Sequence, residues 1–223
     1  MSNTPTTQAR GRRAGRPAGD DADLRNQLLD TAASLFARNG IAGTSLRAIA
    51  DAAEVTPAML HYYFGGKAAL VDALIDERLK PAVQPLHTRL ASTETTPPAL
   101  IEAFVRGMAE VIGSHAWLPA LWVREVVCEG GALRPAVFER VVPQLPQIMA
   151  EHFRRAQNAG QLAPGIDPQL LVVSLVGLTM FPAAGEPIWR QVFDTGAMSV
   201  DGLVRHVLSL LGQGIRGVSG DER

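Results

Sequence analysis

Side chains that often perform catalysis are present in this chain, but they lack the spacing of a catalytic site. The histidines are scattered and show no HExxH pairing: His61, His87, His115, His152 and His206. The single cysteine, Cys128, excludes an intramolecular disulfide and a zinc site built on cysteines. The sequence contains no nucleophile motif and no phosphate-binding loop, so it predicts neither an enzyme nor a bound metal or cofactor.

The other chemistry that the residue types suggest is contact with nucleic acid. The formal net charge is −1, so DNA binding requires a local basic patch. Arg12, Arg13 and Arg16 form such a patch, in a segment with hardly any apolar anchor. We therefore predict a flexible basic arm over residues 1–19. It either enters a minor groove or is a solvated tail that only adds counterion release.

Helical periodicity begins after this arm and predicts a three-helix unit over residues 20–66. Asn39-Gly40 supplies the left-handed stop of the first helix, and Thr44 is the expected N-cap of the second. Thr56-Pro57 are the expected N-cap and first residue of the third helix, which Gly65-Gly66 ends. Three short helices in this order indicate a helix-turn-helix unit.

The rest of the chain is expected to form further helices over residues 67–215, followed by a flexible tail over 216–223. The fourth helix should begin at Lys67 and be bent or ended by Pro81 and Pro85. A long segment from Pro135 to Asn158 should be kinked at its internal prolines. Other helices should open at Thr96-Pro97, near Pro119, at Asp167-Pro168 and at Ser199. No alternating pattern is long enough for a sheet, so the fold class is all-α.

An ordered set of residues between Arg25 and Leu70 matches a known pattern: Leu28-Leu29-Asp30-Thr31-Ala32, Leu35-Phe36, Asn39-Gly40, Thr44-Ser45, Ile49-Ala50, Val55-Thr56, Leu60, Tyr62-Tyr63-Phe64, Lys67 and Leu70. With these residues the segment resembles the DNA-binding domain of TetR-family transcriptional regulators. Glu54 departs from the pattern, because the family commonly has the turn glycine there; a left-handed Glu54 would cost on the order of 1 kcal/mol. His61 stands where the family commonly has tyrosine and would alter a contact to phosphate or base.

The resemblance implies an N-terminal three-helix helix-turn-helix DNA-binding domain followed by a helical-bundle ligand-binding and dimerisation domain. A helix beginning at Thr56 would enter the major groove, while the preceding helix would cross the phosphate backbone. The expected base or sugar contacts are Thr56, Ala58, His61 and Tyr62, and Pro57 belongs to the same surface. The expected phosphate contacts are Thr44, Arg47, Tyr63 and Lys67, with Ser45 beside them. For Lys67 an ordinary solvated lysine is the alternative.

Behind this unit the resemblance is architectural, and it implies an effector-binding bundle around an apolar pocket. Apolar candidates for its wall are Phe104, Met108, Trp117, Trp122, Phe138, Met149, Phe153 and Met180, with ordinary core packing as the alternative for each. Polar candidates to orient an effector are Arg124, Glu125, Cys128 and His152. Arg124 and Glu125 could equally form a surface ion pair.

Two C-terminal segments, Pro168 to Phe181 and Val200 to Leu211, are too apolar to be left exposed on a monomer. They are expected to pair with their mates in a four-helix dimer interface, unless the first is a central core helix. The apolar stretch from Leu170 to Ala184 is too short and interrupted to cross a bilayer, and the N-terminus has no apolar segment typical of a signal peptide. We therefore expect a cytoplasmic protein without a membrane partner.

The resulting hypothesis is a homodimeric DNA-binding transcriptional regulator. It would bind a palindromic or pseudo-palindromic double-stranded DNA operator and act as a repressor that a small apolar or amphipathic effector releases. The alternative is a ligand-binding helical protein, or an enzyme using His152, Glu125 and Cys128, without sequence-specific DNA binding.

Overall fold

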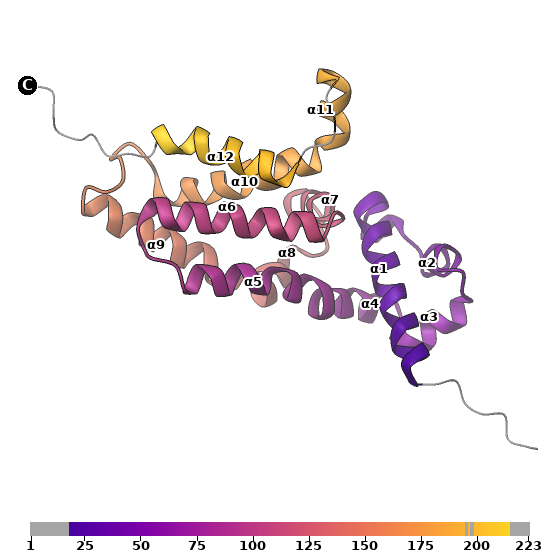
Figure 1. Cartoon of the computed structure of the whole chain (residues 1–223). Coiled ribbons are helices and arrows are strands. Elements are labelled where there is room, and N and C mark those ends of the chain that lie inside the picture. Colours follow the sequence, from indigo (N-terminus) through magenta and orange to yellow (C-terminus); the bar gives the residue numbers. More distant parts are fainter. Residues whose placement is uncertain (1–17, 195, 197–198, 215–223) are drawn as a thin grey trace, which may run out of the picture.

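The computed structural model describes residues 18–194, 196 and 199–214, and all regular structure in these residues is helical. The predicted arm with Arg12, Arg13 and Arg16 lies outside the described residues, as does the predicted tail. The molecule is elongated, with a compact head of four helices at one end and a longer bundle behind it (Figure 1).

The head consists of α1 (Ala18–Gly43), α2 (Leu46–Ala52), α3 (Pro57–Phe64) and α4 (Lys67–Leu74). Apolar residues from each of these helices are fully buried together, among them Leu28, Phe36, Ile49, Leu60 and Leu70. The predicted starts of α3 at Thr56-Pro57 and of α4 at Lys67 are confirmed. Gly65, with a φ of 73°, ends α3 as the sequence predicted.

The connection between α1 and α2 differs from the prediction by one residue. Gly40 has a φ of 78° and breaks the helical geometry inside α1, as expected. The N-cap of α2 is Ser45, whose Oγ accepts a hydrogen bond from the N–H of Ala48 at 3.1 Å. Thr44 was predicted there, but its hydroxyl turns back into the core and donates to the carbonyl of Gly40 at 2.7 Å. Glu54, in the turn before α3, is left-handed with a φ of 58°.

The prediction for Pro81 and Pro85 was that they bend or end the fourth helix, and the helix does not end at either residue. It continues through a π-helical turn, η1 (Ile75–Leu79), into α5 (Lys80–Ala91). The N–H of Lys80 bonds to the carbonyl of Ile75, five residues back, so helical bonding restarts at this point. Pro81 then lies in the first turn of α5, where a missing N–H costs little.

The bundle continues with α6 (Pro97–Ser114), α7 (Leu118–Trp122), η2 (Val123–Val127), α8 (Arg134–Ala136), η3 (Val137–Val141), α9 (Leu145–Asn158), α10 (Pro168–Ala184), α11 (Glu186–Phe193) and α12 (Val200–Gly214). Helix α6 packs between α5 and α12, while α10 packs on α9 (Figure 1). Thr96 and Asp167 are N-caps, as predicted. Ser199 also accepts a hydrogen bond from Gly202 N at 3.0 Å before α12.

Two features of the bundle were not predicted. The expected segment from Pro135 to Asn158 is divided, because Gln144 adopts a left-handed φ of 63° after Pro143 and a new helix then begins. Helix α11 follows α10 across a bend of 69°. Within the described parts of the chain, no single helix is long and apolar enough to cross a membrane, and only α10 and α11 taken together pass that test.

Candidate nucleic-acid interface and apolar cavity

The amino end of α3 is the exposed tip of the head. Thr56, Pro57, Ala58 and His61 are exposed, and Tyr62 is 76% exposed. The opposite side of the same short helix carries buried Leu60 and Phe64. This geometry leaves the leading side chains of α3 free to meet a groove of DNA.

Hydrogen-bond donors for phosphate lie on both sides of this tip. Arg47 on α2 has a side chain that is 84% exposed, and its nearest carboxylate oxygen, on Asp51, is 3.9 Å away. Lys67, at the start of α4, is half-buried and donates from Nζ to the carbonyl of Ala42 at 3.3 Å. Lys67 is therefore held beside the end of α1, which argues against a freely solvated lysine. Ser45 is exposed, although its hydroxyl also caps α2.

Two predicted phosphate contacts are engaged inside the head. Thr44 is only 1% exposed and its hydroxyl is bonded to Gly40, so that side chain is not presented to a ligand. Tyr63 is half-buried, and its hydroxyl donates to Oδ1 of Asp21 on α1 at 2.8 Å. A phosphate contact would need these two hydroxyl groups as donors. Thr44 and Tyr63 are therefore not counted among the side chains that can contact phosphate.

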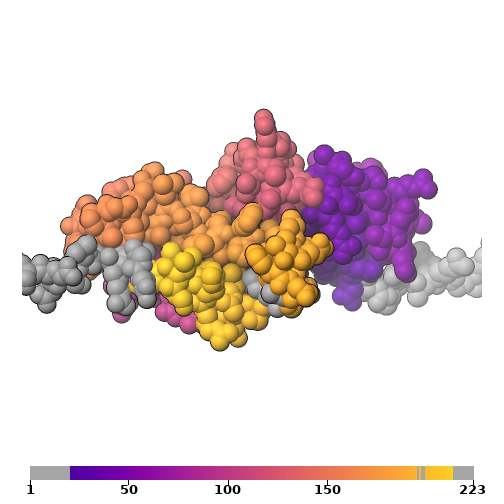
Figure 2. Space-filling model, turned by 90° about the horizontal axis from the view of Figure 1, so that it is seen from above, coloured from indigo at the N-terminus to yellow at the C-terminus, as the bar shows by residue number. Residues whose placement is uncertain are grey.

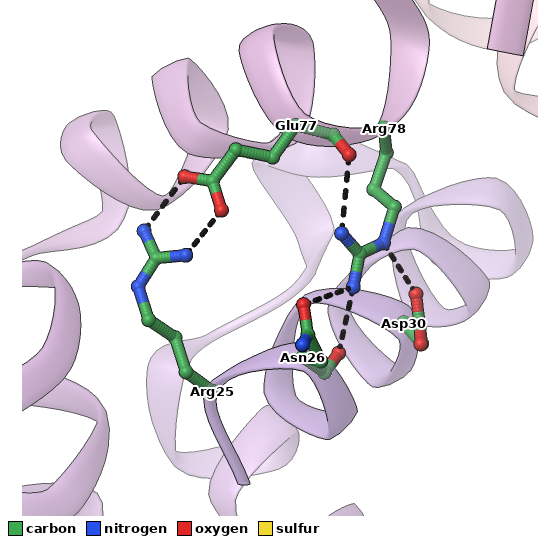
Figure 3. A network of polar contacts seen from close by, with 5 residues as sticks. All are labelled: Arg25, Asn26, Asp30, Glu77 and Arg78. Atoms are coloured by element: carbon green, nitrogen blue, oxygen red, sulfur yellow. Dashed lines mark hydrogen bonds and ion pairs between the residues drawn. The ribbon is translucent and has the colours of Figure 1, made fainter. Parts of the chain in front are cut away.

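Polar contacts along α1 and η1 join the head to the bundle (Figure 3). Arg25 forms a bidentate pair with Glu77, and hydrogen bonds from Arg25 hold the pKa of the Glu77 carboxyl below its usual range. The neighbouring Arg78 donates to Oδ1 of Asp30 at 2.6 Å and to both the carbonyl and the side-chain oxygen of Asn26. These residues fix the angle at which α1 lies on the continuous helical segment formed by α4, η1 and α5.

A second junction, at the other end of α1, involves a residue that was assigned to effector binding. Glu125 on η2 is 6% exposed, and its carboxylate accepts from Ile41 N at 2.8 Å and from Ala132 N at 3.0 Å. Glu125 therefore does not form the surface ion pair with Arg124 that was the alternative, and its predicted role in orienting an effector stays a prediction. The side chain of Arg124 instead lies against Gly40, on the outside of the bundle.

The bundle encloses an apolar cavity of about 530 Å³. Six predicted residues line it: Phe104, Met108, Trp122, Phe138, Met149 and Met180. Phe153 is fully buried but is not part of the lining. Trp117 lies outside the lining and packs edge-to-face on the ring of His115, with centroids 5.8 Å apart. Cys128 is exposed and His152 is half-buried, and neither belongs to the lining. The side of η2 that faces the cavity carries valines. Contact of the predicted polar residues with an effector therefore stays a prediction.

Much of the cavity wall was not identified from the sequence. These wall residues come from several elements around the cavity and include Leu79, Val83, Leu86, Val126 and Leu133. The spacing of Leu79, Val83 and Leu86 along one helical face was the available signal, although the same spacing is typical of ordinary core. No lining residue is charged, so the cavity suits a hydrocarbon chain or ring system, with any polar end of the ligand left outside.

Ionisable side chains do not gather at the cavity among the described residues. Among the residues that the structure describes, no group of three or more histidine, cysteine, aspartate or glutamate side chains could hold a metal ion. The cavity wall carries no ionisable side chain.

A band of exposed apolar side chains follows α10, α11 and α12, which share one face of the molecule in Figure 2. Leu170, Val173 and Phe181 on α10 are 63%, 64% and 71% exposed, and Ile188 and Phe193 on α11 are 71% and 69% exposed. The other side of α10 is buried in the bundle. Helix α10 therefore combines a core face with an exposed apolar face, and patches of this kind mark interaction surfaces.

Residues 28–74 match the family described as "Bacterial regulatory proteins, tetR family". A probable HTH-type transcriptional regulator of Bacillus subtilis, YttP, is 30% identical over 112 residues, which are 49% of this chain and 54% of that protein. The match thus spans about half the length of that relative. The HTH-type transcriptional regulator RutR of Escherichia coli O157:H7 is 28% identical over 218 residues, covering 94% of this chain and 99% of that protein.

Solved structures share the fold over nearly the whole chain. The ketosteroid transcriptional regulator KstR2 of Mycobacterium tuberculosis aligns with a TM-score of 0.71 and 21% identity, covering 92% of this chain and 99% of that one. AibR in complex with isovaleryl coenzyme A and operator DNA aligns with a TM-score of 0.66 and 19% identity, covering 84% of this chain and 97% of that one.

Proposed function

This chain belongs to the TetR family of bacterial regulatory proteins, and we propose that it is a homodimeric repressor released from its operator by an apolar or amphipathic effector. The observation that carries the proposal is the exposed amino end of α3, where Thr56 to Tyr62 can enter a major groove. The proposed contact set is Ser45, Arg47, Thr56, Pro57, Ala58, His61, Tyr62 and Lys67. The basic arm with Arg12, Arg13 and Arg16 is proposed to add phosphate or minor-groove contacts.

The exposed apolar band on α10, α11 and α12 supports the homodimer. Leaving Val173, Phe181 and Ile188 in water is unfavourable, and a second copy related by a two-fold axis would cover the same residues on both chains. A dimer presents two α3 helices, which matches a palindromic or pseudo-palindromic operator. Adjacent half-sites on one DNA face are about 34–36 Å apart.

The apolar cavity supports an effector whose buried part is a hydrocarbon. Its volume of about 530 Å³ lies within the usual range for small-molecule sites. The AibR structure contains isovaleryl coenzyme A together with operator DNA. By analogy we propose an acyl or alicyclic group for the cavity of this chain, with a polar head group such as a thioester-linked carrier outside.

Release from DNA follows from linkage between the two sites. An effector that binds more tightly to the conformation with mismatched head spacing must weaken operator binding by the same factor. A regulator with this arrangement represses in the absence of effector and is relieved in its presence.

The proposal is tested by selecting duplexes from a randomised pool with the full chain, at modest salt and without effector. We expect a palindromic or pseudo-palindromic sequence, with a shift that unlabelled selected duplex abolishes. Arg47→Ala should weaken binding to all duplexes and reduce the slope of log K against log salt by about 2, since a dimer loses two phosphate contacts. Arg154→Ala, an exposed arginine on α9 paired locally with Glu151, is the matched control and should change neither quantity. A folded dimer that enriches no sequence would overturn the proposal.

A further inference from the structure

Glu125 lies between the apolar cavity and the head. Residues next to it line the cavity, and its carboxylate bonds to the head at Ile41 N. Val126, the next residue, lines the cavity. Leu133 lines it as well and follows Ala132, whose N–H bonds to the Glu125 carboxylate at 3.0 Å. The N–H of Leu133 also donates to the Glu125 carbonyl at 3.1 Å. A displacement of the cavity wall at Val126 and Leu133 must therefore move Glu125.

The element that carries Glu125 is a π-helical turn and not a regular α-helical one. In η2 the N–H of Cys128 bonds to the carbonyl of Val123 at 2.9 Å, five residues back. Turns of this π type are rare and are frequent at functional sites. The return of the chain after η2 is tight, because a Cβ added to Gly131 would lie 2.3 Å from the Glu125 carbonyl oxygen. The turn and its return therefore shift together.

On the head side, the carboxylate holds the last turn of α1. Ile41 follows the break at Gly40, and N–H groups after such a break need partners outside the regular helical ladder. Glu125 supplies that partner at 2.8 Å, and the missing side chain of Gly40 allows the close approach of η2. The last turn of α1 leads directly into α2 and α3, so its position sets the position of the recognition helix.

Another polar link between the cavity wall and the head is weaker. Arg140 on η3 pairs with Asp72 and Asp76, but the two aspartate side chains are 61% and 44% exposed. Exposed pairs are screened by water and salt and contribute little. The bond from Ile41 N to the Glu125 carboxylate is buried and the bond from Ala132 N is partly buried, so they fix geometry more strongly.

We propose that Glu125 is the positioning residue through which occupation of the cavity changes the orientation of the head. This inference rests on the proposed function and adds the route by which the effector acts. An occupant that displaces Val126 and Leu133 withdraws the carboxylate from Ile41 N and releases the last turn of α1. The head then leaves the orientation that the bond between Ile41 N and Glu125 maintains.

The test compares the full-length wild type with Glu125→Gln, which keeps the size of the side chain but can accept only one of the two N–H bonds. Glu129→Gln is the control, because it makes the same charge change at an exposed position four residues on. Glu125→Met, which has a similar length and no acceptor oxygen, is the second variant. Folding of each is checked by circular dichroism, and dodecanoyl coenzyme A is the effector probe.

Two quantities are measured: operator affinity with and without the probe, on the duplex selected above, and amide hydrogen exchange of residues 38–44. In the wild type and the control, the probe should weaken operator binding and speed exchange in this segment. In Glu125→Gln, exchange should be about tenfold faster without the probe, and the effect of the probe on operator affinity should fall at least fivefold. Affinity of the probe for the DNA-free protein should change less than twofold.

A merely structural role would weaken operator binding equally with and without the probe, and this result would overturn the inference. If no duplex is selected, the proposed function fails, whereas the exchange measurement still judges Glu125. If the probe does not bind, the acyl effector fails, and Met149→Trp, which fills the cavity from α9, replaces the probe. Met149→Trp is then made in the wild type and in Glu125→Gln. If it changes hydrogen exchange at residues 38–44 equally in these two proteins, the inference is also overturned.

Discussion

Replacing Gly40 by alanine tests the junction between α1 and η2 most directly. Gly40 has a φ of 78° and a ψ of 158°, a region that is essentially restricted to glycine. A residue with a side chain there is strained by about 1–3 kcal/mol. The added Cβ would also lie 3.1 Å from Oε1 of Glu125 and 3.2 Å from Cδ of Arg124.

The two neighbours of the added methyl group differ in how easily they move. The Arg124 side chain is exposed and can swing away at little cost. The Glu125 carboxylate is held by two N–H groups, and shifting it weakens those bonds by about 1 kcal/mol. Together with the backbone strain, we expect Gly40→Ala to lower the free energy of unfolding by about 2–4 kcal/mol.

The assay is urea unfolding followed by far-ultraviolet circular dichroism, with all proteins at the same protomer concentration, because the stability of a dimer depends on concentration. Gly43→Ala is the control. It lies at the end of the same helix without a positive φ, and a Cβ there meets nothing within 4 Å. Alanine at residue 43 should be neutral or stabilising by up to about 1 kcal/mol. Equal stability of the two variants would refute both the backbone geometry and the close packing assigned to Gly40.

Three further predictions concern stability, each measured by urea unfolding. Glu54→Gly should raise the free energy of unfolding by about 0.5–1 kcal/mol by removing left-handed strain, whereas Glu54→Ala should not; equal midpoints would contradict this reasoning. Burial lowers the pKa of His87, and its Nε2 has no hydrogen-bond partner among the described residues. The stability that the neutral ring contributes is therefore present above about pH 6.5 and is lost as the pH falls through the lowered pKa. His87→Leu should therefore lose less stability than the wild type between about pH 7 and pH 5, and identical pH slopes would disprove the assignment. Arg78→Ala should cost about 1–3 kcal/mol because its side chain, 18% exposed, bonds across to α1, while Arg154→Ala should cost under about 0.5 kcal/mol; similar losses would argue against the network in Figure 3.

Local sequence signals predicted several helix starts correctly. Thr56-Pro57 and Asp167-Pro168 each pair an N-cap residue with a proline whose missing N–H is unneeded in the first turn. Gly40 was recognised as a left-handed helix stop, and Gly65-Gly66 as a helix end, for a similarly local reason. Such signals depend on residues a few positions apart, so the order of the head helices and the exposed start of α3 could be predicted from the chain alone.

The errors arose where packing overrides a local preference. Thr44 and Ser45 are both good N-cap residues, and the turn at Gly40 decides which of them faces the core. Pro85 lies inside helix α5, which packs along α6 in the bundle. Helix propensity and capping rules carry no information about these tertiary contacts.

The sequence by itself determined the all-helical fold class, the helices of the head and the apolar character of the bundle, since these follow from residue type and periodicity. Only the tertiary structure decided what Glu125 does. Its carboxylate meets the N–H of Ile41 across 84 positions of sequence, and the rotation of η2 that points valines into the cavity and Glu125 toward α1 is set by packing between helices. The direction of a side chain about a helix axis depends on what the helix packs against, and that information is distributed over the whole fold.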